Sequence, residues 1–305
     1  SSHVGSSVQG QDSRSNGGAP PLGMQRHACL KLLAALLVVH LAAEHWGQGS
    51  LRPLAFGRPP GTNPLAARKA RGRTRLYLDT ADREQWAKHL PLGIFDGITT
   101  NPELCRRAGV AVSEERLSEL AHDALNQVDE VMVQAWGGTV ESFLETGTAM
   151  SKLSPERVIV KLPLTRAGVE AAGKLREKGV RLCMTACYTQ HQVFTSVGLG
   201  AEFVAPYLGR ICDDWQNRTD CSKAEALRHG LGELKAMQRI VNGMGASTRV
   251  LVASIRSPEF LAALAAEGCD SFTFSPAVAE ALCGVPLTEE AATNFEEAAR
   301  VAGES

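Results

Sequence analysis

A lysine interrupts an otherwise apolar run in the middle of the chain. Lys161 stands in VIVKLPL, a pattern typical of a strand buried on both faces. A lysine that points into a closed barrel loses its water, which favours the neutral, nucleophilic amine over the ammonium ion. The alternative is a strand-end lysine that extends to solvent. Lys161 is therefore a candidate nucleophile.

Two further polar residues close apolar runs nearer the N-terminus. Asp79 ends RLYLDT, and a carboxylate beside an amine can move protons while the amine and a carbonyl form a carbinolamine and then an imine. The alternative is that Asp79 caps a helix beginning at Ala81. Asn101 in GITTNP is suited to hold the hydroxyls of a polyol, although Asn-Pro is also a common turn opener.

Two arginines and a serine follow apolar runs in the second half of the chain. Arg210, Ser254 and Arg256 offer two guanidinium forks and a hydroxyl, which are groups that bind phosphate. The alternative is a set of surface residues paired with acids such as Asp213 or Asp214. The sequence contains no GxxxxGK loop and no GxGxxG fingerprint, which disfavours a nucleotide enzyme.

Gln134, Thr185 and Tyr207 stand at the ends of other apolar runs. Taken singly, each is explained as a core polar residue that satisfies its own hydrogen bonds. They share with the stronger candidates a position at the carboxyl end of a predicted strand. That shared position makes them candidate site residues.

From about Arg75 onward, short apolar runs alternate with amphipathic stretches. Strands are predicted at Leu76–Leu78, Gly97–Thr100, Val131–Trp136, Val158–Leu162, Arg181–Ala186, Phe203–Tyr207, Val250–Ser254 and Ser271–Phe274. Helices are predicted at Ala81–His89, Ser113–Gln127, Val140–Lys152, Arg166–Lys178, Gln190–Leu199, Lys223–Asn242, Pro258–Glu267 and Ala277–Leu282. This alternation predicts parallel strands with crossovers, and eight such units fit an α/β fold, the (β/α)8 TIM barrel, whose catalytic groups lie at the carboxyl ends of its strands. An extra C-terminal helix, Glu289–Ala302, could cap the barrel or reach a neighbouring subunit.

Charge and composition limit the partners. The chain has 32 basic and 33 acidic residues, and this balance argues against nucleic acid as a partner, so a small-molecule substrate is expected. His89, His122, His191 and His229 fall in predicted helices or helix starts, without an HExxH motif or Cys/His ligand spacing. No metal site is expected.

Residues 1–74 differ in kind from the rest and are expected to form a disordered targeting leader before a barrel domain at 75–305. The apolar run Leu32–Ala43 follows Arg26 and Lys31 and is too short to span a bilayer, as in a signal peptide. Arginine and lysine then accumulate with almost no acid, as in a transit peptide. This order predicts a plastid protein with a bipartite leader, and the alternative is a secreted protein. The mature protein is not expected to associate with a membrane.

From about Leu76 to Arg300 the chain resembles the transaldolase family, in particular its short subgroup that contains fructose-6-phosphate aldolase. The resemblance rests on seven segments in one order, namely LYLDT, GITTNP, VMVQAW, VIVKLPLT, MTACY, GAEFVAPYLGRI and VLVASIRS. It implies a class I aldolase in which Lys161 forms the Schiff base and Asp79 assists. It also implies no metal or organic cofactor, and a pentamer or decamer that uses the C-terminal helix.

The resemblance also assigns the binding residues. It places Thr99 and Asn101 near the donor hydroxyls of the substrate. Phosphate recognition falls to Arg210, Ser254 and Arg256. The expected substrate is therefore a sugar phosphate.

Two reactions follow from such a Schiff base. Fructose 6-phosphate could be cleaved to dihydroxyacetone and glyceraldehyde 3-phosphate, or its dihydroxyacetone unit could be transferred to another sugar phosphate, the transaldolase reaction of the pentose phosphate pathway. The resemblance associates glutamine and tyrosine at positions 134 and 207 with hydrolytic aldolases, and this chain has Gln134 and Tyr207. Together with Thr185, these residues predict an aldolase. A remote alternative is a non-catalytic barrel that binds sugar phosphates.

Overall fold

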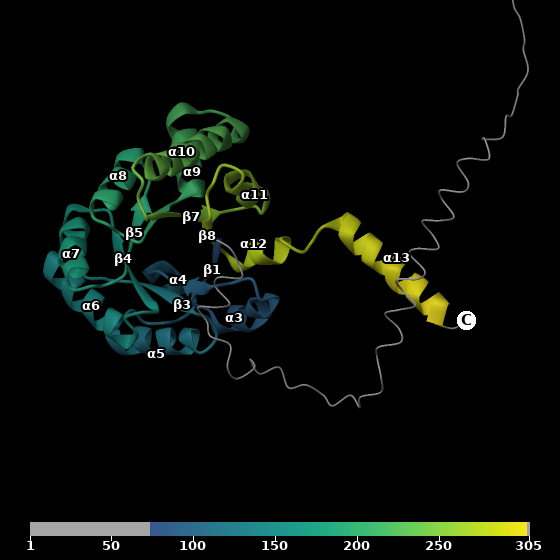
Figure 1. Cartoon of the computed structure of the whole chain (residues 1–305), viewed down its shortest axis with the longest axis horizontal. Coiled ribbons are helices and arrows are strands. Elements are labelled where there is room, and N and C mark those ends of the chain that lie inside the picture. The colour runs from purple at the N-terminus through teal and green to yellow at the C-terminus, as the bar shows by residue number, and fades with distance from the viewer. Residues whose placement is uncertain (1–73, 304–305) are drawn as a thin grey trace, which may run out of the picture. The chain divides into compact units, whose positions relative to one another are not determined.

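The computed structural model describes residues 74–303, so the predicted leader lies outside the described residues apart from Thr74. Eight parallel strands close into a barrel, and each strand pairs with the strands before and after it in the sequence. Most of the helices surround these strands, and the C-terminal helix extends away from the barrel (Figure 1). The predicted (β/α)8 barrel with an additional C-terminal helix is confirmed.

The strands have the following bounds: β1 Arg75–Asp79, β2 Gly97–Thr99, β3 Glu130–Gln134, β4 Val158–Pro163, β5 Leu182–Cys187, β6 Phe203–Pro206, β7 Arg249–Ile255 and β8 Ser271–Phe274. The helices are α3 Arg83–His89, η1 Leu90–Leu92, α4 Pro102–Arg107, α5 Glu114–Leu125, α6 Val140–Leu153, α7 Arg166–Glu177, α8 Gln190–Gly198, α9 Leu208–Thr219, α10 Lys223–Gly243, α11 Glu259–Ala265, α12 Pro276–Ala281 and α13 Pro286–Gly303. All eight predicted strands are present, with ends that differ from the prediction by no more than two residues.

Side-chain caps explain where many of the helices begin. Six helices are preceded by a residue whose side chain accepts a hydrogen bond from a backbone N–H of the first turn, namely Asp82, Asn101, Ser113, Thr139, Thr165 and Ser222. Each such cap stabilises a helix by about 1 kcal/mol. The caps therefore help to fix where each of these six helices begins.

The sequence prediction missed α4, α9 and η1. α4 was missed because Asn-Pro was interpreted as a turn, whereas Asn101 caps this helix and Pro102 occupies its first position. α9 carries apolar side chains at Leu208, Ile211 and Trp215, a helical spacing that its many charged residues obscured. The omission matters because α9 carries Arg210.

The interior of the barrel is filled in layers. An apolar cluster below and beside the pocket is formed by Tyr77, Met132, Ile159, Cys183, Phe203, Ala205 and Leu251. Gly97 makes room for this cluster, since a Cβ there would lie 2.5 Å from the Glu130 carbonyl oxygen and 2.8 Å from the Tyr77 ring. Side chains along a strand alternate between its faces, so the residues two positions further along also point inward. These positions carry polar groups, among them Asp79 and Lys161.

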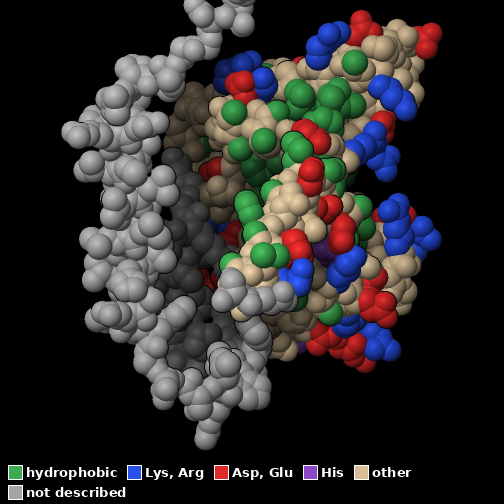
Figure 2. Space-filling model, turned by 90° about the vertical axis from the view of Figure 1, so that its right-hand side faces the viewer, with side chains coloured by type: hydrophobic (Ala, Val, Ile, Leu, Met, Phe, Trp, Pro, Cys, Tyr) green, Lys and Arg blue, Asp and Glu red, His purple; other side chains and the backbone are tan. Residues whose placement is uncertain are grey.

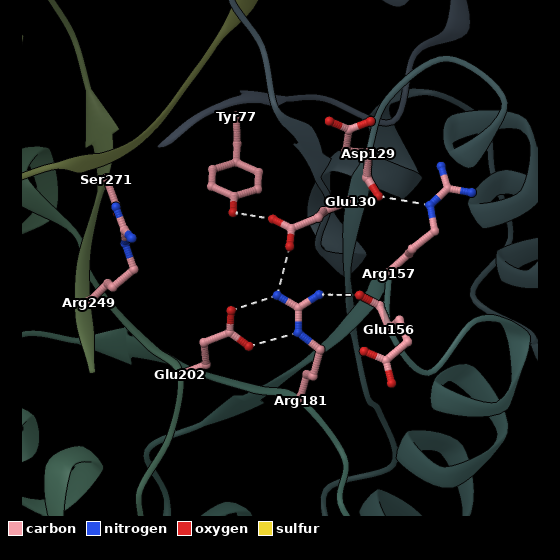
Figure 3. A network of polar contacts seen from close by, with 9 residues as sticks. All are labelled: Tyr77, Asp129, Glu130, Glu156, Arg157, Arg181, Glu202, Arg249 and Ser271. Atoms are coloured by element: carbon pink, nitrogen blue, oxygen red, sulfur yellow. Dashed lines mark hydrogen bonds and ion pairs between the residues drawn. The ribbon is translucent and has the colours of Figure 1, made fainter. Parts of the chain in front are cut away.

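A network of ion pairs and hydrogen bonds closes the amino end of the barrel (Figure 3). Arg181 Nη2 lies 2.7 Å from Glu130 Oε1 and 2.6 Å from Glu202 Oε1, while Nη1 donates to the Glu156 carbonyl at 2.6 Å. The Tyr77 hydroxyl donates to Glu130 Oε2 at 2.8 Å. Burial and the charge of Glu130 raise the pKa of Tyr77 well above its ordinary value, so the phenol stays protonated.

The C-terminal helix α13 has no buried residue. Leu287, Phe295 and Val301 on it are 78%, 72% and 56% exposed. Figure 2 views the side of the molecule on which α13 lies and shows hydrophobic side chains open to the surface. Among the described residues, no helix has the length and apolar character needed to cross a membrane.

Candidate active site

A pocket of about 450 Å³ opens at the carboxyl ends of the strands. Of the ten predicted site residues it brings together seven, namely Asp79, Asn101, Gln134, Lys161, Tyr207, Arg210 and Ser254. Thr99 and Thr185 lie beneath it, each in hydrogen-bond contact with a lining residue. Arg256 does not line this pocket.

Lys161 lies in the floor of the pocket. Its side chain is 4% exposed, and Nζ donates to the Thr100 carbonyl at 2.9 Å. The alternative of a strand-end lysine extending to solvent is therefore wrong. In register with Lys161 stand Gln134 on β3 and Cys183 on β5. Burial raises the pKa of Cys183 to about 12, so this neighbouring thiol is neutral and does not compete as a nucleophile.

Asp79 lies across the barrel interior from Lys161. Thr99 Oγ1 donates to Asp79 Oδ1 at 2.6 Å. Burial raises the pKa of Asp79, while the charge of Lys161 and the Thr99 hydrogen bond oppose that rise. The helix-cap alternative for Asp79 is wrong, because Asp82 caps α3 by accepting from the backbone N–H of Glu84. Asp79 is thus available to exchange protons in the pocket.

A second hydroxyl pair lies at the ends of β5 and β6. Thr185 Oγ1 and Tyr207 Oη are 2.9 Å apart, and Tyr207 lines the pocket. The ring of Tyr188 packs edge-on against Tyr207 with centroids 5.8 Å apart. This packing fixes the phenol on the same side of the pocket as Arg210, which follows in the first turn of α9.

Two residues with left-handed backbone conformation change the direction of β5 and β7 near Thr185 and Tyr207. Ala186 has φ 55° and Ser254 has φ 57°. Each lies within a register shift, between Met184 and Cys187 in β5 and between Val252 and Ile255 in β7. Such conformations cost non-glycine residues roughly 1–3 kcal/mol, and strain of this kind gathers at functional sites. Both shifts lie at the carboxyl ends of their strands, where the pocket opens.

Asn101 caps a helix and also faces the pocket. Its Oδ1 accepts from the Leu104 backbone N–H at 3.0 Å, which makes it the cap of α4. Asn101 also lines the pocket. Since capping occupies the carbonyl half of the amide, the NH2 half is the part that can serve a ligand.

The three predicted phosphate residues are divided between two cavities. Arg210 and Ser254 line the pocket with Lys161, whereas Arg256 lines a neighbouring cavity of about 500 Å³ that also touches Ser254. Arg256 Nη1 donates to Asp213 Oδ1 at 2.7 Å, and this bond lowers the pKa of Asp213. The pairing that the alternative predicted is therefore present, and it leaves the Arg256 side chain beside Ser254 in the neighbouring cavity. A Cβ on Gly209 would lie 2.8 Å from Arg256 Nε and 2.9 Å from Ser254 Oγ, so both groups face the start of α9.

Sequence reasoning missed three polar residues that line the pocket. Glu103 and Arg107 lie on α4, which was not predicted. Thr273 lies on β8 and is 3% exposed. The strand-end rule would have found Thr273, because it is the penultimate residue of a correctly predicted strand.

Fold and pocket together define a (β/α)8 barrel with a buried lysine in a pocket at its strand ends. The family model described as Transaldolase/Fructose-6-phosphate aldolase matches residues 76–304. A probable transaldolase of Leptospira biflexa is 29% identical over 223 residues, covering 73% of this chain and 96% of that protein. Probable transaldolase 2 of Bacillus anthracis is 30% identical over 225 residues, covering 72% and 95%. The chain belongs to the transaldolase/fructose-6-phosphate aldolase family.

Proposed function

We propose that this chain is a Schiff-base aldolase that cleaves fructose 6-phosphate to dihydroxyacetone and glyceraldehyde 3-phosphate. The observation that carries the proposal is a nearly fully buried amine, Lys161, in a pocket that also holds a carboxylate and an arginine. The amine suits a ketose carbonyl, and the guanidinium of Arg210 suits a phosphate at the far end of the sugar.

The steps follow from these groups. Lys161 Nζ attacks the C2 carbonyl, and Asp79 moves the protons that turn the adduct into a carbinolamine and release water to leave an imine. Asp79 then accepts the proton of the C4 hydroxyl, the C3–C4 bond breaks as the C4 aldehyde forms, and the imine accepts the electron pair of the broken bond. Glyceraldehyde 3-phosphate departs, and a three-carbon enamine remains on the lysine. Thr99 and Asn101 serve the hydroxyls of the donor.

The fate of the enamine decides between aldolase and transaldolase. The phenol of Tyr207, 2.9 Å from Thr185 Oγ1, is a proton donor that a phenylalanine could not replace. With Gln134 beside Lys161, these groups can protonate the enamine and hold the water that frees dihydroxyacetone. Transaldolase is the second candidate, and the names of the relatives favour it.

The first test is covalent trapping. Borohydride reduction with saturating fructose 6-phosphate should add a sugar-derived mass to Lys161, and Lys161→Ala should abolish it. Lys174→Ala is the matched control, because Lys174 is half-exposed and pairs with Glu170 on α7. Absence of any adduct in the native protein would leave a non-catalytic barrel that binds sugar phosphates.

The second test separates the two enzymes. Sustained release of glyceraldehyde 3-phosphate from fructose 6-phosphate alone is expected for an aldolase. Turnover only after erythrose 4-phosphate is added would refute the aldolase assignment and support transaldolase.

Two further proposals concern assembly and location. The exposed α13, with Phe295 72% exposed, suits contact with another subunit of a pentamer or decamer. Removing residues 286–305 should then reduce the native mass in sedimentation, and an unchanged mass would refute this role. The leader at 1–74 suits import into a plastid. Secretion of a full-length fluorescent fusion into the medium would contradict import.

A further inference from the structure

Three hydroxyl and carboxyl groups from adjacent strands form a chain beside Lys161. Thr273 Oγ1 on β8 lies 2.5 Å from Thr99 Oγ1 on β2, which lies 2.6 Å from Asp79 Oδ1 on β1. β1 pairs with both β2 and β8, so the barrel itself brings the three side chains together. Thr99 is 0% exposed and Thr273 3% exposed, while Thr273 and Asp79 both line the pocket.

We propose that Thr273 is a positioning residue that directs the Thr99 hydroxyl at Asp79 and thereby maintains Asp79 in its ionised form. The contribution of Thr273 to the reaction rests on the proposed function. The hydrogen-bonded arrangement of Thr273, Thr99 and Asp79 does not depend on it.

The direction of the chain follows from counting protons. An ionised carboxylate only accepts hydrogen bonds, and a threonine hydroxyl has one proton to donate. The Thr99 proton therefore points to Asp79, and the contact of 2.5 Å with Thr273 requires Thr273 to be the donor. Consecutive hydrogen bonds with the same direction strengthen one another, so the Thr273 donor reinforces the bond that Asp79 receives.

Protonation of Asp79 reverses this order. A protonated Asp79 can donate to Thr99, whose hydroxyl then turns towards Thr273. The Thr273 proton is released to point into the pocket, where it can meet a hydroxyl of the bound sugar. Each hydroxyl oxygen keeps its own proton and only rotates, so the hydrogen bonds of the three groups follow the protonation state of Asp79.

Asp79 requires this support because burial opposes its ionisation. The charged group acting on it is Lys161 on β4, and β2 and β8 contribute hydroxyls. On its own strand, Tyr77 points to the amino end and is bonded to Glu130. Lys161 and the two hydroxyls therefore both favour the ionised form of Asp79, which desolvation disfavours.

The test compares Thr273→Val with Thr273→Ser by two measurements. The first is the pH titration of the Asp79 carboxyl carbon by 13C NMR without substrate, and the second is the pH profile of kcat with fructose 6-phosphate. Thr273→Val should move the Asp79 titration and the acid limb of kcat upward by roughly half a pH unit. Thr273→Ser, which retains the hydroxyl, should restore both.

Thr248→Val is the matched control. Thr248 is also buried and donates its hydroxyl to the Ala201 carbonyl at 2.7 Å, before β7 begins. Its replacement should lower stability without moving either pH curve. An Asp79 titration unchanged in Thr273→Val would overturn the positioning role. A native protein that forms no adduct with fructose 6-phosphate would instead refute the proposed function, and the carboxyl titration would still decide the role of Thr273.

Discussion

Replacing Arg181 by methionine should destabilise the barrel far more than its position at the amino end suggests. The change removes the guanidinium that lies 2.7 Å from Glu130 Oε1, while the Glu130 carboxylate, whose side chain is 1% exposed, keeps the hydrogen bond from Tyr77. Breaking a buried ion pair by removing one partner costs about 3–5 kcal/mol. Typical domains are stable by about 5–15 kcal/mol, so this loss is a large fraction of the total.

The assay is urea unfolding followed by tryptophan fluorescence at fixed protein concentration. Glu202→Gln is the control, because Glu202 is 37% exposed and its loss should cost about 1 kcal/mol or less. The double variant Glu130→Gln/Arg181→Met should recover part of the loss, since the glutamine beside Tyr77 carries no charge. If Arg181→Met loses no more than Glu202→Gln, the buried pair is not what stabilises the amino end.

The remaining predictions concern the pocket. The raised pKa of Asp79 places the acid limb of the kcat profile above the usual aspartate pKa of about 3.9, so kcat should fall as the pH drops below that raised pKa. Asp79→Asn should remove the acid limb together with most of the activity. Arg256→Ala should raise KM for phosphorylated substrates about ten-fold or more and spare dihydroxyacetone, whereas equal losses would indicate a structural role. Asp213→Asn frees Arg256, and inorganic phosphate should then inhibit at about three- to ten-fold lower concentration; an unchanged inhibition constant would contradict competition by Asp213. Tyr207→Phe should slow release of dihydroxyacetone and favour transfer to erythrose 4-phosphate, and an unchanged product ratio would exclude Tyr207 as the proton donor.

The spacing of apolar residues predicted the barrel, and the polar residues at the ends of the predicted strands gave much of the pocket. Lys161 could be identified because a charged residue in an apolar strand is conspicuous. The position of Thr273 near a strand end was readable from the sequence, but its contact with Thr99 was not, because that contact depends on how β8 and β2 lie on either side of β1. The pairing of Arg256 with Asp213 was left open for a related reason. Such a pair depends on how α9 approaches β7, and α9 itself was not predicted.

The filled lower half of the barrel has a kinetic consequence. Tyr77 and Phe203 occupy the interior below Lys161, and the Arg181 network closes the amino end, so in residues 74–303 the pocket mouth is the approach to the amine. If the proposed function holds, a bound sugar phosphate would occupy that mouth, and bulk water or a second aldehyde would reach the enamine only after the first aldehyde had left. On that proposal the architecture favours an ordered cycle, in which the aldehyde product departs before the reagent that ends the cycle arrives.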